Sequence, residues 1–242
     1  NAQALRRVVH TTVALGLTAG AVLSAAGVLL TPQILRWMGT PPEVLGDSIV
    51  YFRVYFIGSL SVVMYNVEAS ILQSVGDSRS PMIYLIVASL LNVVLDLWFI
   101  AGLHMGVGGA ALATILSQTV SALLAFRRLT CTEAAYGVRW RQVRFHPATL
   151  RAVIAQGVPS GLQNSVVSLA NVIVQANINA FGAQAMAGCG AYSKLEGFAF
   201  LPVTCFSMAL ATYVSQNVGA GRPDRVRSSM RFGLAGSRLL AG

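Results

Sequence analysis

Asn92 and Asp96 lie one helical turn apart inside the apolar run 82–101. Placing a carboxylate in lipid costs roughly 2.5–3.5 kcal/mol on insertion scales, so such a residue usually faces a bundle interior or a water-filled cavity and belongs to an ion or proton pathway. Oxygen ligands suit Na⁺, and a carboxyl group withdrawn from water can also hold a proton. The pair therefore predicts a cation site in a transport protein; the alternative is a buried Asp that anchors a helix end.

A second polar face lies on the next apolar segment, 106–128, and includes Thr114. The two segments are joined by a short connection, which makes them antiparallel neighbours whose polar faces can meet. We therefore expect Asn92, Asp96 and Thr114 to converge on one site.

Within the segment 148–181, six amide and hydroxyl residues are spaced by three or four positions: Ser160, Asn164, Ser168, Asn171, Gln175 and Asn179. At ~100° per residue they occupy roughly a 100° sector of one helix. Interhelical hydrogen bonding is one interpretation of such residues in membranes. Their number on one face favours the other interpretation, a water-filled substrate cavity.

Two glutamates lie inside other apolar segments. Glu196 precedes Pro202, and a proline kink in a transporter helix often marks a gate or cavity, so Glu196 is a candidate for contact with substrate or a proton. Glu68 lies near the end of its segment. For Glu68 the favoured interpretation is structural pairing with Arg79 or with an arginine of the 127–151 loop.

Composition indicates the elements that position these groups. Hydrophobic residues make up 55% of the chain and charged residues 10%, and the mean hydropathy is +0.66. These values exceed what a soluble domain of this length needs for its core, and the apolar stretches are long enough to cross a bilayer. We predict an all-α polytopic membrane protein with spans near 8–30, 49–75, 80–101, 106–128, 148–181 and 184–218, and a seventh that begins at about Met230.

The distribution of arginine predicts the orientation. If successive loops alternate across the bilayer, only Arg36 lies in a loop on one side, and thirteen arginines lie on the other: Arg6, Arg7, Arg79, Arg127, Arg128, Arg139, Arg141, Arg144, Arg151, Arg222, Arg225, Arg227 and Arg231. This asymmetry predicts that the 127–151 and 219–231 loops are cytoplasmic, in a multi-pass protein of the inner (plasma) membrane. The net charge of +9 then reflects loop topology and contact with lipid headgroups, not nucleic-acid binding.

Cysteine and histidine patterns point to neither a metal site nor an enzyme. Cys131, Cys189 and Cys205 show no metal-ligand spacing, and we expect them to be small buried hydrophobic residues. The histidines lie at segment ends or in loops and no Gly-x-Ser-x-Gly motif occurs, so an intramembrane hydrolase is disfavoured. Asymmetric, non-repeating polar faces disfavour a passive channel.

Six motifs extend over nearly the whole chain: Tyr51–Phe56, Tyr65–Asn66, Ile71–Pro81, Leu91–Asp96, Gly106–Thr114 and Gln216–Arg222. Together, and in this order, they resemble the multidrug and toxic compound extrusion (MATE) family. The resemblance implies twelve helices in two lobes, of which this chain would supply helices three to eight and the start of nine, without either end. Residues 1–128 would then belong to the amino-terminal lobe, 129–147 would form a cytoplasmic inter-lobe linker, and 148–242 would begin the carboxy-terminal lobe.

The resemblance also implies a function: secondary active efflux of organic, cationic or amphipathic compounds in exchange for inward H⁺ or Na⁺. Asn92, Asp96, Thr114 and Tyr51 match the amino-terminal-lobe cation site of prokaryotic members, and Val167 stands where some members have Glu in the other lobe. No cofactor is expected besides the coupling ion, and no metal besides Na⁺ at Asp96. Expected partners are a small-molecule substrate and membrane lipid, with a monomeric full-length protein. The alternative is a lipid-linked precursor or polysaccharide flippase, which should carry a strongly cationic cavity.

Overall fold

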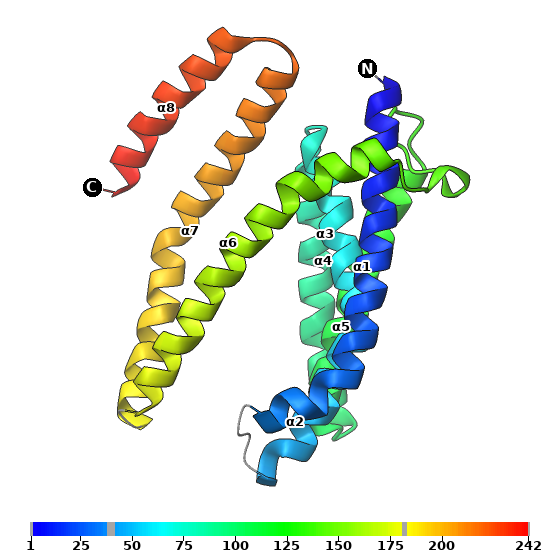
Figure 1. The fold of residues 1–242 in the computed structure, drawn as a ribbon. Coiled ribbons are helices and arrows are strands. Elements are labelled where there is room, and N and C mark those ends of the chain that lie inside the picture. The colour runs from blue at the N-terminus through cyan, green and yellow to red at the C-terminus, as the bar shows by residue number, and fades with distance from the viewer. Residues whose placement is uncertain (1, 38–41, 181–182, 242) are drawn as a thin grey trace. The chain divides into compact units, whose positions relative to one another are not determined.

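The computed structural model describes residues 2–37, 42–180 and 183–241, and most of them are helical (Figure 1). The helices are α1 (Ala2–Trp37), α2 (Pro42–Ile57), α3 (Ser59–Ser74), α4 (Arg79–Asp96), the π-helix η1 (Leu97–Gly102), α5 (Gly106–Thr130), the 3₁₀-helix η2 (Trp140–Gln142), α6 (Pro147–Ala180), α7 (Ala183–Gly219) and α8 (Pro223–Ala241). The described residues contain no strand, and the all-α fold expected from composition is confirmed.

Four helical segments in the described ranges are long and apolar enough to cross a membrane: α1, α4 with η1, α5 and the Gly188–Gly219 part of α7. The bent pair α2 and α3 would add a fifth span. The helix α6 is long enough but is not among them, because its row of amides and hydroxyls dilutes the apolar residues. The count of six complete spans remains a prediction.

The segment 49–75, expected as one span, is divided at Gly58. There α2 and α3 meet at an angle of 42°. A side chain at Gly58 would overlap Ile115 of α5, so the bend lets the chain approach α5 closely. Glycine also weakens a helix because it has more conformational freedom to lose, which suits it to a break.

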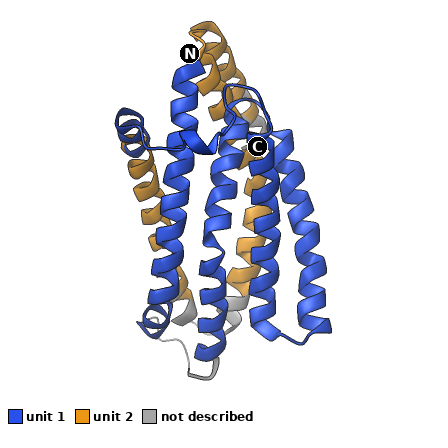
Figure 2. Ribbon diagram, turned by 90° about the vertical axis from the view of Figure 1, so that its right-hand side faces the viewer, with its two compact units in different colours: residues 1–154 blue, residues 155–242 orange. Residues whose placement is uncertain are grey.

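The chain divides into two compact units, residues 1–154 and 155–242 (Figure 2). In unit 1, α3 packs against α1 and α5, and α5 also packs against α2 and α4. Its buried apolar core joins three of these helices and the connection after α5 through Val9, Val13, Met64, Ile71, Leu72, Leu129 and Val138. The helices of unit 1 thus enclose a core of their own.

Small residues let α1 approach its neighbour α3. A side chain at Gly16 would lie 2.9 Å from Val67, and one at Gly20 would lie 2.7 Å from Leu60. The spacing of four places both glycines on one face, the small-xxx-small arrangement of closely packed membrane helices. The face of α1 that lacks side chains is therefore the one that contacts α3.

The polar connection between α5 and α6, residues 131–146, belongs to unit 1 and packs against its helices. Val138 is 3% exposed and belongs to the core, and the Arg139 N–H donates to His10 Nε2 at 3.1 Å. Cys131 at its start is exposed, as is Cys205 on α7, and Cys189 is half-buried. The expectation of buried cysteines is wrong, because Cys131 follows the last residue of α5 and the described surface of α7 is largely uncovered.

Unit 2 contains the rest of α6 with α7 and α8. The two helices α7 and α8 pack together, yet most described side chains of the unit are exposed; Asn217, at 7%, is buried. The helix α8 begins at Pro223, earlier than the expected start at about Met230. Proline is favoured in the first turn of a helix, and Asp224 complements the helix dipole there.

Candidate cation and substrate sites

Asn92 and Asp96 lie in the last two turns of α4, and both side chains are half-buried. Asn92 Nδ2 and Asp96 Oδ1 are shielded from solvent but have no hydrogen-bond partner among the described residues. More than nine in ten buried polar atoms in proteins have a partner, so two unsatisfied atoms one turn apart require an explanation.

A π-helix begins directly after Asp96. In η1 the Leu103 N–H donates to the Trp98 carbonyl at 2.9 Å, the i to i−5 bond that defines such a turn. The turn rests on α5, because a side chain at Gly109 would lie 3.1 Å from the Phe99 Cβ. Single π-turns within helices occur frequently at functional sites.

Thr114 lies on α5, which packs against α4 and η1. Its hydroxyl is half-buried and donates to the Ala110 carbonyl of its own helix at 3.0 Å, which leaves the oxygen lone pairs able to accept or to bind a cation. Tyr51 lies on α2, which also packs against α5. Its ring stacks on that of Tyr55, with the ring centroids 6.3 Å apart. The four expected ligands thus come from three mutually supported helices; their convergence on one point remains a prediction.

The polar row on α6 has exposed side chains at Asn164, Ser168, Asn171 and Gln175. The side chain of Asn179 lies outside the described part of the structure. Glu196 on α7 is also exposed. The exposed residues of this row and Glu196 belong to unit 2, and their role in a substrate cavity remains a prediction.

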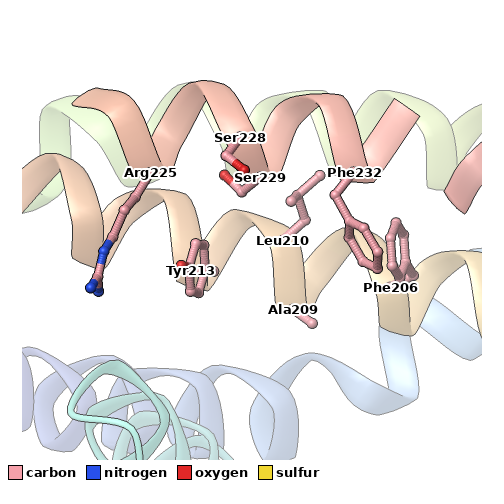
Figure 3. Close-up of a pocket in the computed structure, with 8 residues that line it drawn as sticks. All are labelled: Phe206, Ala209, Leu210, Tyr213, Arg225, Ser228, Ser229 and Phe232. Atoms are coloured by element: carbon pink, nitrogen blue, oxygen red, sulfur yellow. The ribbon is translucent and has the colours of Figure 1, made fainter. Parts of the chain in front are cut away.

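A cavity that the sequence did not indicate lies between α7 and α8 (Figure 3). It has a volume of about 500 Å³ and is lined by Phe206, Ala209, Leu210, Tyr213, Arg225, Ser228, Ser229 and Phe232. Aromatic rings, hydroxyls and one guanidinium make it amphipathic. Because α8 starts earlier than expected, the sequence interpretation placed no helix opposite α7 at Arg225 and missed this cavity.

The surroundings of Glu68 differ most from what the sequence predicts. It is 2% exposed, its Oε2 atom has no hydrogen-bond partner, and no arginine of the described residues forms an ion pair with it. The predicted pairing with Arg79 or a loop arginine is wrong. The reason is geometric: Glu68 lies on the buried side of α3, whereas Arg79 is exposed at the start of α4.

The carboxylate that does pair is Asp77, in the turn between α3 and α4. It accepts hydrogen bonds from the Ser80 N–H at 3.0 Å and the Ser80 hydroxyl at 2.8 Å, and lies 3.5 Å from Arg128 Nε at the end of α5. Desolvation acts to raise the pKa of Asp77, but the Ser80 hydrogen bonds and the Arg128 charge outweigh it and hold the pKa below its usual range. This contact fixes the α3–α4 turn to α5.

Comparison with known proteins decides what kind of protein carries these residues. The family model described as MatE matches residues 1–98 and 159–241, which is most of the chain. The chain belongs to the MATE family. Members of this family are multi-pass membrane transporters of small molecules, and the resemblance found in the motifs is confirmed.

Two relatives and one solved structure show the extent of the similarity. The probable multidrug resistance protein YpnP of Bacillus subtilis is 30% identical over 87% of this chain and 46% of its own length. The probable multidrug resistance protein NorM of Thermotoga maritima is 30% identical over 96% of this chain and 51% of its own length. A MOP superfamily transporter from Pyrococcus furiosus shares the fold with a TM-score of 0.88, at 24% identity, over 97% of this chain and 52% of that chain. The MATE chain therefore spans about half the length of the relatives it matches.

Proposed function

We propose that this MATE chain is part of a secondary active transporter that exports organic, cationic or amphipathic compounds in exchange for inward H⁺ or Na⁺. The observation that carries the proposal is the pair of buried, unsatisfied atoms Asn92 Nδ2 and Asp96 Oδ1. Loops 127–151 and 219–231 are placed on the cytoplasmic side of the inner membrane in this proposal, on the strength of their arginines.

The chemistry of the pair fits a coupling cation. Asp96 provides a negative charge, and rotation of the Asn92 amide by half a turn exchanges its nitrogen for its oxygen at the same buried position. Two oxygen ligands would then face one point beside α5, where Thr114 provides a third. In the other form of coupling, a proton bound to Asp96 would neutralise the buried carboxylate.

Substrate contact is assigned to unit 2, through the α6 row and Glu196. Lipid offers amides no hydrogen-bond partner, so a row of them along one helix requires protein, water or ligand on that face. These groups are amides, hydroxyls and one acid, which suits organic cations better than pyrophosphate-linked lipids. Relatives named as probable multidrug resistance proteins support organic compounds as the exported class.

The test of coupling is Asp96→Asn in the complete transporter. Asparagine keeps size and hydrogen bonding but cannot bind and release a proton or present a full charge to Na⁺. We expect coupled export to fall at least tenfold at matched expression. The ion gradient drives transport only if the ion binds one conformational state more tightly than the other, and the variant lacks the group that provides this difference. Glu133→Gln, at an exposed carboxylate in the 131–146 connection, is the matched control.

Drug efflux is measured in vesicles under an imposed proton or sodium gradient, one at a time. Wild-type efflux by Asp96→Asn would show that Asp96 has a structural role only. For the substrate assignment, Asn171→Leu should change the range of exported compounds, whereas Ile173→Leu, on another face of α6, should not. An unchanged range in Asn171→Leu contradicts the cavity assignment.

A further inference from the structure

A basic cavity lies where the beginning of α1 meets the 131–146 connection, within unit 1. Its volume is about 450 Å³, and it is lined by Gln3, Arg6, Arg7, His10, Arg141, Gln142, Arg144 and His146. Four guanidinium groups and two imidazoles surround it, with two amides and no carboxylate. The cavity lies far along the chain from Asn92 and Asp96, and the transport proposal makes no use of it.

The two walls of this cavity are fastened together by buried groups. His10, 2% exposed, donates from Nδ1 to the Arg6 carbonyl at 2.7 Å and accepts from the Arg139 N–H at 3.1 Å. These two bonds fix the neutral tautomer with its proton on Nδ1. The His10 ring thus joins the first turns of α1 to the connection.

A second fastening lies one residue further along α1. The Thr11 hydroxyl, fully buried, accepts from the His146 N–H at 3.3 Å and forms a hydrogen bond with the His146 ring Nδ1 at 3.2 Å. Each contact joins residues more than a hundred positions apart in the sequence. The arginines are therefore brought together by a defined tertiary contact, beyond their general abundance on this side of the protein.

The charges in the cavity are uncompensated by protein. The ion pair found among the described residues joins Arg128 to Asp77, and neither of these residues lines the cavity. Four like charges around one space repel one another unless an anion lies between them. The planar fork of a guanidinium matches the oxygens of a phosphate with two parallel hydrogen bonds, which makes arginine the preferred residue for phosphate recognition.

We propose that this cavity binds a phosphate group, as the phosphodiester of an anionic lipid or as free phosphate. The helix α1 is apolar enough to cross a membrane, and the cavity lies at its first turns, the depth at which lipid headgroups are found. The volume lies within the usual range for small-ligand sites, so it admits a headgroup with its glycerol.

The experiment compares two double variants of the complete transporter with equal loss of charge. Arg6→Gln with Arg144→Gln removes two cavity arginines; Arg127→Gln with Arg151→Gln removes two exposed arginines outside the cavity lining. Binding of phosphatidylglycerol, with phosphatidylcholine as reference, is measured by native mass spectrometry of the protein in detergent. Inorganic phosphate is titrated in parallel by calorimetry.

We expect the cavity variant to lose at least roughly tenfold in affinity, because each charge-assisted hydrogen bond contributes on the order of a tenfold change. The control variant should lose less than about twofold by the same reasoning, since screened surface charges contribute little. Selective loss of phosphatidylglycerol binding identifies lipid as the source of the phosphate, and selective loss of saturable phosphate binding identifies the free anion. Equal loss in both variants, or no loss in the cavity variant, overturns the proposal.

A second measurement on the unchanged protein covers the case in which the cavity variant is poorly folded. Phenylglyoxal labels accessible arginines, and mass spectrometry locates the labels. Phosphatidylglycerol or inorganic phosphate should slow labelling of Arg6 and Arg144 severalfold while Arg127 is labelled at its usual rate. Equal labelling of Arg6 and Arg144 with and without both probes overturns the proposal.

Discussion

The helices α5 and α7 have the same mean hydropathy over their most apolar stretches, yet 44% of that stretch is buried within the protein in α5 and none of it in α7. The two helices represent their units: the buried hydrophobic side chains of the described residues lie in unit 1, between Val9 and Val138. Hydropathy thus identifies a segment suited to lipid but does not reveal which of its faces contacts other helices.

Residue size distinguishes the two helices better. The buried residues of α5 are mostly small, at Gly109, Ala111, Ala113, Ser117, Ser121, Ala122 and Ala125. Small residues let helix backbones approach, and dispersion contacts then replace the missing hydrophobic drive between helices in lipid. In α7 most described side chains are exposed, and α8 covers only part of the helix.

The largest difference between the two units should appear when one glycine in each is replaced by alanine. In the 242-residue chain, Gly58→Ala should lower stability by roughly 1–3 kcal/mol, because the new Cβ overlaps Ile115 and the core must shift. Gly161→Ala on α6 meets open space and should be neutral or stabilising by about 0.5–1 kcal/mol. Thermal unfolding followed by circular dichroism measures both; equal destabilisation would show that the α6 surface is as crowded as the core of unit 1.

The next effect concerns the glutamates. Glu68→Met should stabilise unit 1 by about 1–3 kcal/mol, because it removes a buried acceptor without a partner and keeps a flexible side chain of similar size. Glu196→Met, at an exposed position of unit 2, should change stability by less than about 0.5 kcal/mol. A destabilised Glu68→Met variant in denaturant titrations would reveal a partner for this carboxyl in the folded protein.

The smallest effect concerns the Asp77 contact, which has no counterpart at the exposed Asp224 of unit 2. Asp77→Asn should cost about 1 kcal/mol at neutral pH, as for the loss of a helix cap with a partly exposed ion pair. The pKa of Asp77 is lowered from 3.8, so this stabilisation is present above that value and is lost as pH falls through the lowered folded pKa. Thermal shifts of wild type and variant from pH 7 downward should converge only in acid, and a constant difference between them at every pH would contradict the assigned contact.

Much of the helix layout could be predicted from the sequence. The ends of α4 with η1, α5, α6 and α7 lie within two residues of the predicted segments 80–101, 106–128, 148–181 and 184–218. The positive φ of Gly76 and Gly106 shows why the chain turns at those two positions. Asn92 and Asp96 were expected one turn apart on a single helix, and they are. These features depend on local spacing alone, which a sequence displays directly.

Features that depend on long-range approach were missed. The break at Gly58 requires Ile115, and the docking of the 131–146 connection requires His10 and Thr11. The burial of Glu68 depends on the helices that pack against α3. In each case the decisive partner lies on another helix or more than a hundred residues away. Hydrophobic periodicity contains no information on such pairs, because many arrangements of the same helices satisfy it equally well.

The π-turn after Asp96 has a consequence for chain length. A π-turn holds one residue more than an α-turn, so the positions that follow Gly102 are displaced by about 100° from an uninterrupted helix. Phe99 lies inside the π-turn and packs on Gly109 of α5. Deleting one residue within Leu97–Gly102 would rotate the positions that follow the π-turn while leaving Asn92 and Asp96 on their face of α4. The register of this helix end is therefore set by a residue count, and an alignment of relatives requires a one-residue gap wherever the turn is absent.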